Sequence, residues 1–397
     1  MSGAVKRKGT VKTMSGNKRI VFLDYLRVFA CLMVMFVHAC EQYYFGADGG
    51  LRFESAGDAF WATWIDSACR AAVPLFVIAS SYLLFPLTKP TGEFFKRRFV
   101  RVVIPFAIWC GVYVWRFDGK PTDCIFNFPM ATGGHLWFVP MLLGLYLLMP
   151  LLSPWAEKAS EKEVRGWLLV WLFTTAFPFL RKLWACFFAA GTDPATGMYW
   201  AHTFGTGDFA SIPFLWGECA WNGFGTFHYV SGFIGYLLLG LYFRKFVPEL
   251  SWKRTLVWAV PLWAVGYAIV GAFFYFRIPG NGTFPVSGPY ASAVDLEMSW
   301  EFCSTGVALT VIGYFLVLRK FVADGWLYAK AIRPLSEASY GTYLMHIIVL
   351  VFLAEHLKGS VPTPLAIVLI AVGSFAVSSV AGIVIRKIPF VGKWIVG

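Results

Sequence analysis

Long apolar runs are the feature that most limits what this chain can fold into. Ten continuous, mostly apolar runs follow one another along the sequence, separated by more polar segments. A run of about 20 apolar residues is long enough to cross a bilayer as a helix. Because the runs are continuous and do not alternate between polar and apolar residues, helices are the expected spanning elements. The runs lie at residues 19–44, 69–87, 100–115, 136–154, 166–184, 229–246, 252–275, 300–318, 339–355 and 364–385.

Composition excludes an ordinary soluble protein. Only 14% of the 397 residues are charged and 58% are hydrophobic, whereas a soluble chain carries about 25% charged residues. A larger core cannot explain this deficit, because a soluble surface would still need its charges. Aromatic residues make up 19% of the chain, which fits spans flanked by aromatic belts. We therefore predict an all-α, polytopic transmembrane helix bundle of about ten spans, with a single transmembrane domain over residues 20–390.

Positive charge is unevenly divided between the two predicted sides. With the N-terminus in the cytoplasm, the inner segments carry 25 of the 34 Lys and Arg residues, the outer segments carry 8, and Arg27 lies within the first run. This excess on one side follows the positive-inside rule and predicts that both termini are cytoplasmic. It also accounts for the net charge of +12, so no nucleic-acid partner is predicted. The basic residues 1–19 are expected to form a disordered cytoplasmic tail.

The first apolar run carries a polar stripe. Its ionisable residues are Asp24, Arg27, His38 and Glu41. At about 100° per residue, a helix places all four within one face about 100° wide. Ionisable groups inside a membrane usually mark a functional site, although they could also pair with neighbouring helices for structural reasons. Two further residues of this face are small enough to leave room for a ligand, Cys31 and Val34.

His38 has the chemistry for acyl transfer. Its unperturbed pKa of about 6.5 suits a general base near neutral pH. It could take the proton of an acceptor hydroxyl that attacks a thioester, or it could carry the acyl group itself. Glu41 follows at i+3 and would either orient the imidazole or lie as a charge at the membrane interface. Both residues are therefore candidate catalytic residues.

A basic cluster lies on the predicted cytoplasmic side, before the third run. Its arginines, Arg97, Arg98 and Arg101, could simply obey the positive-inside rule, but clustered arginines also bind phosphates well. Arg27 shares this side and lies about 16 Å from His38 along the helix axis, a separation comparable to an extended pantetheine arm. We therefore predict that these four arginines bind a phosphorylated cofactor from the cytosol.

Other motifs are scarce. The sequence contains no serine-hydrolase, HExxH or Walker motif and no metal-ligand spacing, so no metal is predicted. The eight cysteines are interpreted mainly as small apolar residues, with a bridge among Cys124, Cys186 and Cys219 left open. Two long outer segments, 185–228 and 276–299, are rich in Gly, Pro and aromatic residues. Their tryptophans fit either a sugar-stacking platform or an interfacial belt.

Five segments, in the same order, resemble the acyltransferase type 3 family of integral membrane O-acyltransferases. The first is the stretch from Leu23 to His38, in which Arg27 and His38 are separated by ten residues as in the family. The others are VPLF with SSYLL at 73–84, the basic RRFVR at 97–101, HLWF at 135–138, and SYGTYLMH at 339–346. The chain is most similar to the HLWF-type branch, without a C-terminal hydrolase-like domain. It departs from the family at Ser81, where a glycine is usual, and in the missing proline after His346.

The resemblance implies an acyl donor, acetyl-CoA or a related acyl-CoA, that enters from the cytosol. It implies His38 as the catalytic residue, Arg27 as a donor-side group, and the hydroxyl of a cell-envelope glycan or its lipid-linked precursor as the acceptor. The expected location is the lipid bilayer of a bacterial inner membrane. His135, at the outer mouth of the fourth run, and Trp137 are candidate acceptor-binding residues, although His135 could instead be an interfacial histidine. His346 is expected to make a hydrogen bond between helices.

Two other classes of function fit parts of this pattern. The polar stripe could line the path of a transporter or flippase for a lipid-linked glycan. The expected internal repeat of a transporter is not evident in the sequence. A receptor or scaffold with structural charges would bind no CoA.

Overall fold

The computed structural model describes most of the chain. The described residues are 19–46, 50–117, 134–188, 230–276, 278, 284–292 and 299–397, and the side chains of 177–188 and 287–292 are not included. The predicted tail up to residue 18, the bridge among Cys124, Cys186 and Cys219, and the tryptophans of segment 185–228 therefore lie outside the described residues.

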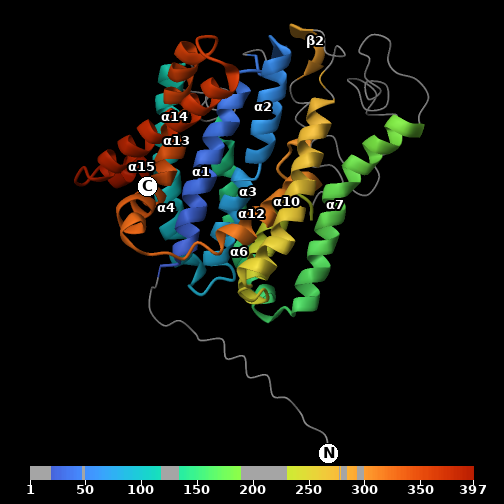
Figure 1. Ribbon diagram of the computed structural model, residues 1–397. Coiled ribbons are helices and arrows are strands. Elements are labelled where there is room, and N and C mark those ends of the chain that lie inside the picture. The colour runs from blue at the N-terminus through green and yellow to red at the C-terminus, as the bar shows by residue number, and fades with distance from the viewer. Residues whose placement is uncertain are drawn as a thin grey trace, which may run out of the picture.

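A helix lies in each of the ten predicted runs (Figure 1). In chain order the helices are α1 (Val21–Glu41), α2 (Ala56–Cys69), α3 (Ala72–Leu84), α4 (Thr91–Arg116), η1 (Gly134–Trp137), α6 (Phe138–Lys158), α7 (Glu161–Phe188), α9 (Ile234–Lys245), α10 (Trp252–Tyr275), α12 (Thr305–Leu318), η3 (Tyr328–Ile332), α13 (Arg333–Leu357), α14 (Thr363–Arg386) and α15 (Gly392–Val396). Within the described ranges, seven helical segments are long and apolar enough to cross a membrane. The chain is thus a multi-pass helical membrane protein, while the count of ten spans and the cytoplasmic termini stay predictions.

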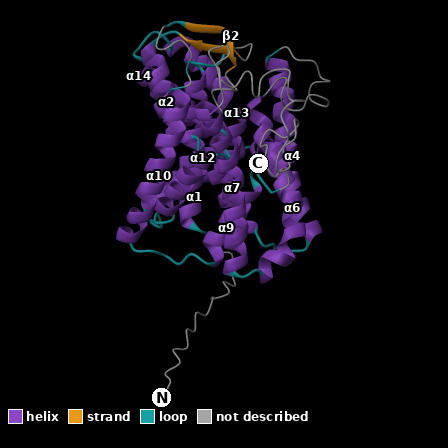
Figure 2. Cartoon of the chain, turned by 90° about the vertical axis from the view of Figure 1, so that its right-hand side faces the viewer, coloured by secondary structure: helices purple, strands orange, loops and turns teal. Residues whose placement is uncertain are grey.

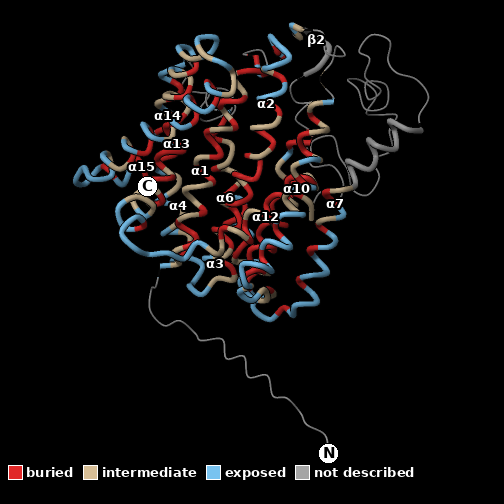
Figure 3. The backbone as a smooth tube through the Cα atoms, viewed as in Figure 1, coloured by how far each residue is buried: buried red, intermediate tan, exposed pale blue. Residues whose placement is uncertain are grey.

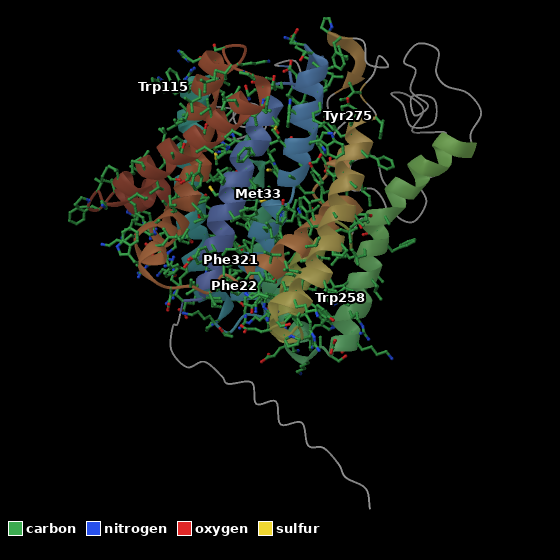
Figure 4. The ribbon with its side chains drawn as sticks, in the orientation of Figure 1. Phe22, Met33, Trp115, Trp258, Tyr275 and Phe321 are labelled. Atoms are coloured by element: carbon green, nitrogen blue, oxygen red, sulfur yellow. The ribbon has the colours of Figure 1, made fainter. Side chains whose placement is uncertain are left out.

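Helix α1 lies in the middle of the bundle. It packs against α2 and α3 on one side and against α13 and α14 on the other, and it also contacts α12 (Figure 1). Buried residues follow the inner helices and exposed residues follow the periphery (Figure 3). Along α1, Phe22 and Met33 are 6% and 3% exposed, whereas Trp115 at the edge of the bundle is 81% exposed (Figure 4). A surface that exposes large apolar side chains is expected where lipid surrounds the protein.

The second helical segment begins earlier than predicted. Helix α2 begins at Ala56, where the Ser55 hydroxyl accepts a hydrogen bond from the Asp58 amide, and α2 and α3 together form one apolar segment over 56–84. Arg70, counted above among the eight cations of the outer segments, therefore lies inside this segment and is 5% exposed, so that assignment is wrong. The charges at Asp58 and Asp66 interrupt the apolar run, which is why the predicted run begins after them, at residue 69.

Two short strands depart from the all-α prediction. Strand β1 (Gly50–Phe53) pairs antiparallel with β2 (Val286–Ser292), with Leu51 opposite Gly288. The pair covers the end of the bundle at which α1 ends (Figure 2). The bundle itself is helical as predicted. The strands escaped prediction because β1 has only four residues and β2 contains a glycine and a proline, which favour turns over strands.

Ser81, which stands where the family usually has a glycine, contacts the facing helix α9. The Ser81 hydroxyl donates a hydrogen bond to the carbonyl of Leu237 on α9, at 2.5 Å. A Cβ at Gly240 on α9 would lie 2.6 Å from the Ser81 Cβ and 3.0 Å from the Ile78 carbonyl. The close approach of α3 and α9 is thus retained by a glycine on the facing helix. Small residues commonly allow such contacts between membrane helices.

We predict that Gly240→Ala lowers stability by about 1–3 kcal/mol, because the added methyl overlaps α3 and forces it to move. The matched control is Gly144→Ala on α6, where an added Cβ meets no atom within 4 Å and alanine favours the helix by up to about 1 kcal/mol. The measurement is the thermal unfolding midpoint of both variants in the same detergent. Equal midpoints for the two variants would contradict the close contact.

Candidate active site

The polar stripe of α1 faces α13, and the two helices run parallel here. The facing positions are Asp24 and Ser336, Cys31 and Ser339, and His38 and His346. Cys31 and Val34 are only 1% and 7% exposed, and the Cys31 Sγ lies 3.8 Å from the Ser339 carbonyl. The expected room for a ligand beside these two residues is therefore wrong for this structure, because both are buried and α13 covers Cys31.

Asp24, toward the N-terminal end of the stripe, is a carboxylate whose oxygens accept several hydrogen bonds. It is 1% exposed and accepts hydrogen bonds from Arg19 at 2.5 and 2.9 Å, from the Tyr328 hydroxyl at 2.6 Å and from the Ser336 hydroxyl at 2.7 Å. Its hydrogen bond to Asp24 raises the pKa of Arg19 above the ordinary value for arginine. Arg27 reaches the same carboxylate only at 3.4 Å. The charge of Asp24 is thus neutralised mainly by Arg19, which leaves Arg27 weakly paired.

The predicted arginine cluster divides between two places. Arg98 on α4 is half-buried and lies close enough to Arg27 for the two charges to repel each other. Arg97 is exposed and pairs with Glu93 at 2.7 Å. Together with Arg101, it lines an open hollow of about 410 Å³ on the surface of α4. Only Arg98 is therefore brought toward the polar stripe of α1.

His38 and Glu41 form a pair at the C-terminal end of the stripe. The His38 Nδ1 lies 2.5 Å from a Glu41 carboxylate oxygen. A carboxylate accepts hydrogen bonds, so the Nδ1–H donates and Nε2 keeps its lone pair. The two side chains are 16% and 26% exposed. The geometry is that of an imidazole held in the tautomer that a general base requires.

Two more histidines meet His38 from other helices. The ring centre of His346 lies 5.1 Å from those of both His38 and His135, and His38 and His135 are 6.3 Å apart. His135 is 9% exposed, so it does not lie at the surface as an interfacial histidine would. The Nδ1 of His346 bonds the Tyr343 carbonyl of its own helix, which makes the expected bond between helices wrong. Among the described residues, no group of three or more His, Cys, Asp or Glu is arranged to hold a metal ion.

Comparison with known proteins decides the family. A family model described as an acyltransferase domain matches residues 20–383. The chain belongs to the acyltransferase type 3 family. The match includes Arg27, His38 and the HLWF segment, so the resemblance seen in the sequence is confirmed, and the chain is a membrane acyltransferase. Neither the curated proteins nor the solved structures gave a match.

Trp137 lies apart from the three histidines of this acyltransferase. Its ring stacks on Phe302 at 5.4 Å and lies 5.9 Å from the ring of Phe233. Its predicted contact with the acceptor would therefore require an acceptor that reaches beyond His135 toward α9. The role of Trp137 in acceptor binding stays a prediction.

A buried ion pair near Glu41, formed by Asp66 and Arg70, was not predicted from the sequence. The Arg70 guanidinium donates to Asp66 at 2.7 and 2.9 Å and to the Tyr44 hydroxyl at 2.9 Å, and it lies 4.4 Å from the centre of the Trp300 ring. Its positive charge also acts on Glu41. The i, i+4 spacing of Asp66 and Arg70 is typical of an ion pair on a helix. The signal was missed because the predicted second run begins at residue 69 and leaves Asp66 outside it.

We predict that Arg70→Met lowers stability by about 3–5 kcal/mol, because it removes the guanidinium that pairs with the buried Asp66 carboxylate. The matched control is Lys89→Gln, which breaks the exposed Lys89–Glu93 pair and should change little. The thermal unfolding midpoints of both variants are measured in the same detergent. Adding Asp66→Leu to Arg70→Met should recover part of the loss, whereas an Arg70→Met protein that unfolds like the wild type would contradict the argument.

Proposed function

We propose that this acyltransferase moves an acyl group, acetyl in the first instance, from cytosolic acetyl-CoA to a hydroxyl of a cell-envelope glycan or its lipid-linked precursor. The bacterial inner membrane is the proposed location, with both termini in the cytoplasm. The observation that carries the proposal is the polarity of α1. A weakly paired arginine lies toward its start, and a histidine–carboxylate pair lies at its end.

The donor end is suited to phosphate. Arg27 has one long contact to a carboxylate, and no described carboxylate forms an ion pair with Arg98. Two guanidinium groups that repel each other are stabilised by an anion between them, and guanidinium binds phosphate through paired, charge-assisted hydrogen bonds. Arg97 and Arg101, which line the open hollow on the same helix as Arg98, would hold a further phosphate of the same donor.

The acyl transfer would proceed at His38. Its Nε2 takes the proton from the acceptor hydroxyl, the hydroxyl oxygen forms a bond to the thioester carbonyl carbon, and the carbon–sulfur bond then breaks. The proton passes from His38 to the leaving thiolate, so no external acid or oxidant is needed. Glu41 stabilises the imidazolium that forms between the two proton transfers. A route in which His38 carries the acyl group would use the same nitrogen.

The acceptor end of this route would be formed by His135 and Trp137. His135 enters the histidine cluster from η1, and its ring lies 6.3 Å from that of His38. Trp137 would stack on a more distant sugar ring of the glycan.

We predict that His38→Ala lowers acyl transfer by about 10²–10⁴-fold, because the base is lost. Glu41→Gln should cause a smaller loss of acyl transfer, because glutamine stabilises the Nδ1–H tautomer and the imidazolium of His38 less than glutamate does. The assay incubates purified protein with labelled acetyl-CoA and envelope glycan from a strain that lacks this enzyme. The control is His356→Ala, an exposed histidine of α13. Undiminished transfer by His38→Ala would end the proposal, and glycan movement across liposomes without transfer would favour a flippase.

We further predict that Arg98→Gln weakens binding of CoA by about 10-fold or more, because a charged hydrogen bond to phosphate contributes about 1.5–3 kcal/mol. Arg97→Gln should weaken it less, since Arg97 already pairs with Glu93. Isothermal titration with CoA measures both affinities. Equal affinities for the wild type and Arg98→Gln would exclude Arg98 from the donor site.

A further inference from the structure

Two buried imidazole nitrogens beside His38 have no hydrogen-bond partner. They are the Nε2 atoms of His135 and His346, whose side chains are 9% and 0% exposed. A buried polar atom without a partner costs about 1–3 kcal/mol. Such atoms are rare in native proteins and call for an explanation. Two of them beside the proposed catalytic base indicate a site that a ligand completes.

The hydrogen bonds of the three rings define what that ligand must offer. The Nδ1 of His346 faces the Tyr343 carbonyl at 2.5 Å, and because a carbonyl only accepts, Nδ1 carries the proton and Nε2 the lone pair. The ring of His135 bonds the backbone of Leu344, and since its Nε2 is unpartnered, Nδ1 makes that bond. His38 also has its Nδ1 engaged. All three Nε2 atoms are therefore acceptors.

A cluster of three acceptors suits a neutral ligand with several O–H donors. His346 lies between the other two rings, 5.1 Å from each, so a ligand that places one hydroxyl at His38 brings its neighbouring hydroxyl close to His346. An ammonium group would offer donors as well, but a buried charge without a counter-ion is costly in this setting. A carboxylate or phosphate offers no donor.

We propose that His346 accepts a hydrogen bond from a second hydroxyl of the acceptor, adjacent to the one that is acylated, so that the enzyme selects a vicinal diol. This inference rests on the proposed acyl transfer and adds His346 to the acceptor-binding residues. The second hydroxyl keeps its proton and only donates a hydrogen bond. The first hydroxyl loses its proton to His38, its oxygen bonds to the acyl carbon, the carbon–sulfur bond breaks, and the proton ends on the CoA thiol.

Two small alcohols test the selection directly. The probes are cis-1,2-cyclohexanediol and cyclohexanol, supplied at equal concentration with labelled acetyl-CoA to the purified full-length protein. The wild type should acetylate the diol with a kcat/KM about tenfold or more above that for the single alcohol, as one additional hydrogen bond to a buried acceptor predicts. The diol should also raise the Tm of the CoA-bound protein more than cyclohexanol does.

Variants of His346 separate binding from folding. In His346→Phe the ratio of the two kcat/KM values should fall to about one, and the Tm difference between the two alcohols should disappear. His346→Gln restores an acceptor oxygen and should recover part of the ratio. The matched control is His356→Phe, because His356 makes the same kind of Nδ1 contact, to the Phe352 carbonyl, at an exposed place on the same helix. This control should retain the wild-type ratio.

The failure of this inference differs from the failure of the proposed function. Equal kcat/KM values for the two alcohols in the wild type, or an unchanged ratio in His346→Phe, would overturn diol selection while acyl transfer stands. A wild type that neither acetylates the diol nor is stabilised by it more than by cyclohexanol would also overturn it. Acetyl-CoA consumption that is the same in the wild type and His38→Ala would instead count against the proposed function.

Discussion

The parallel contact between α1 and α13 is the interaction on which the rest of the site depends. A bilayer offers no water to ionisable groups, so each must find a partner inside the protein. Along this contact, Asp24 is saturated by Arg19, Tyr328 and Ser336, and the His38 Nδ1 is satisfied by Glu41. What the contact leaves weakly paired is Arg27 at one end and the imidazole Nε2 atoms at the other. These are the groups to which the proposed chemistry assigns a ligand.

The weakly paired groups differ in kind along the helix. Toward its N-terminal end the helix offers the positive charges of Arg27 and Arg98, which attract an anion. Its C-terminal end offers neutral acceptor nitrogens and a single carboxylate, which suit hydroxyl donors. Between them, Cys31 is covered by Ser339, so an extended cofactor arm would have to pass beside α13 or displace it. The same helix contact that orients His38 therefore also controls how the acyl group reaches it.

Much of the architecture could be predicted from the sequence, because helices in a bilayer must be long and apolar. The ten runs each contain a helix, and the spacing of Arg27 and His38 placed both on one face. The sequence could not reveal which distant helix covers that face, so His346 was assigned a structural hydrogen bond. Arg70 was misplaced because charges mask the start of α2, and the split between Arg97 and Arg98 depends on where α4 sits against α1. The pairing of β1 with β2 depends on contact between segments more than 200 residues apart.

Proteoliposomes that contain the protein in one orientation test the central claim that α1 links a donor on one side of the membrane to an acceptor on the other. Acetyl-CoA is supplied only on the side of the N-terminus, and a membrane-impermeant envelope glycan only on the opposite side. The account predicts acetylated glycan in this arrangement and none when donor and acceptor are exchanged. Transfer that requires both substrates on the same side would contradict it.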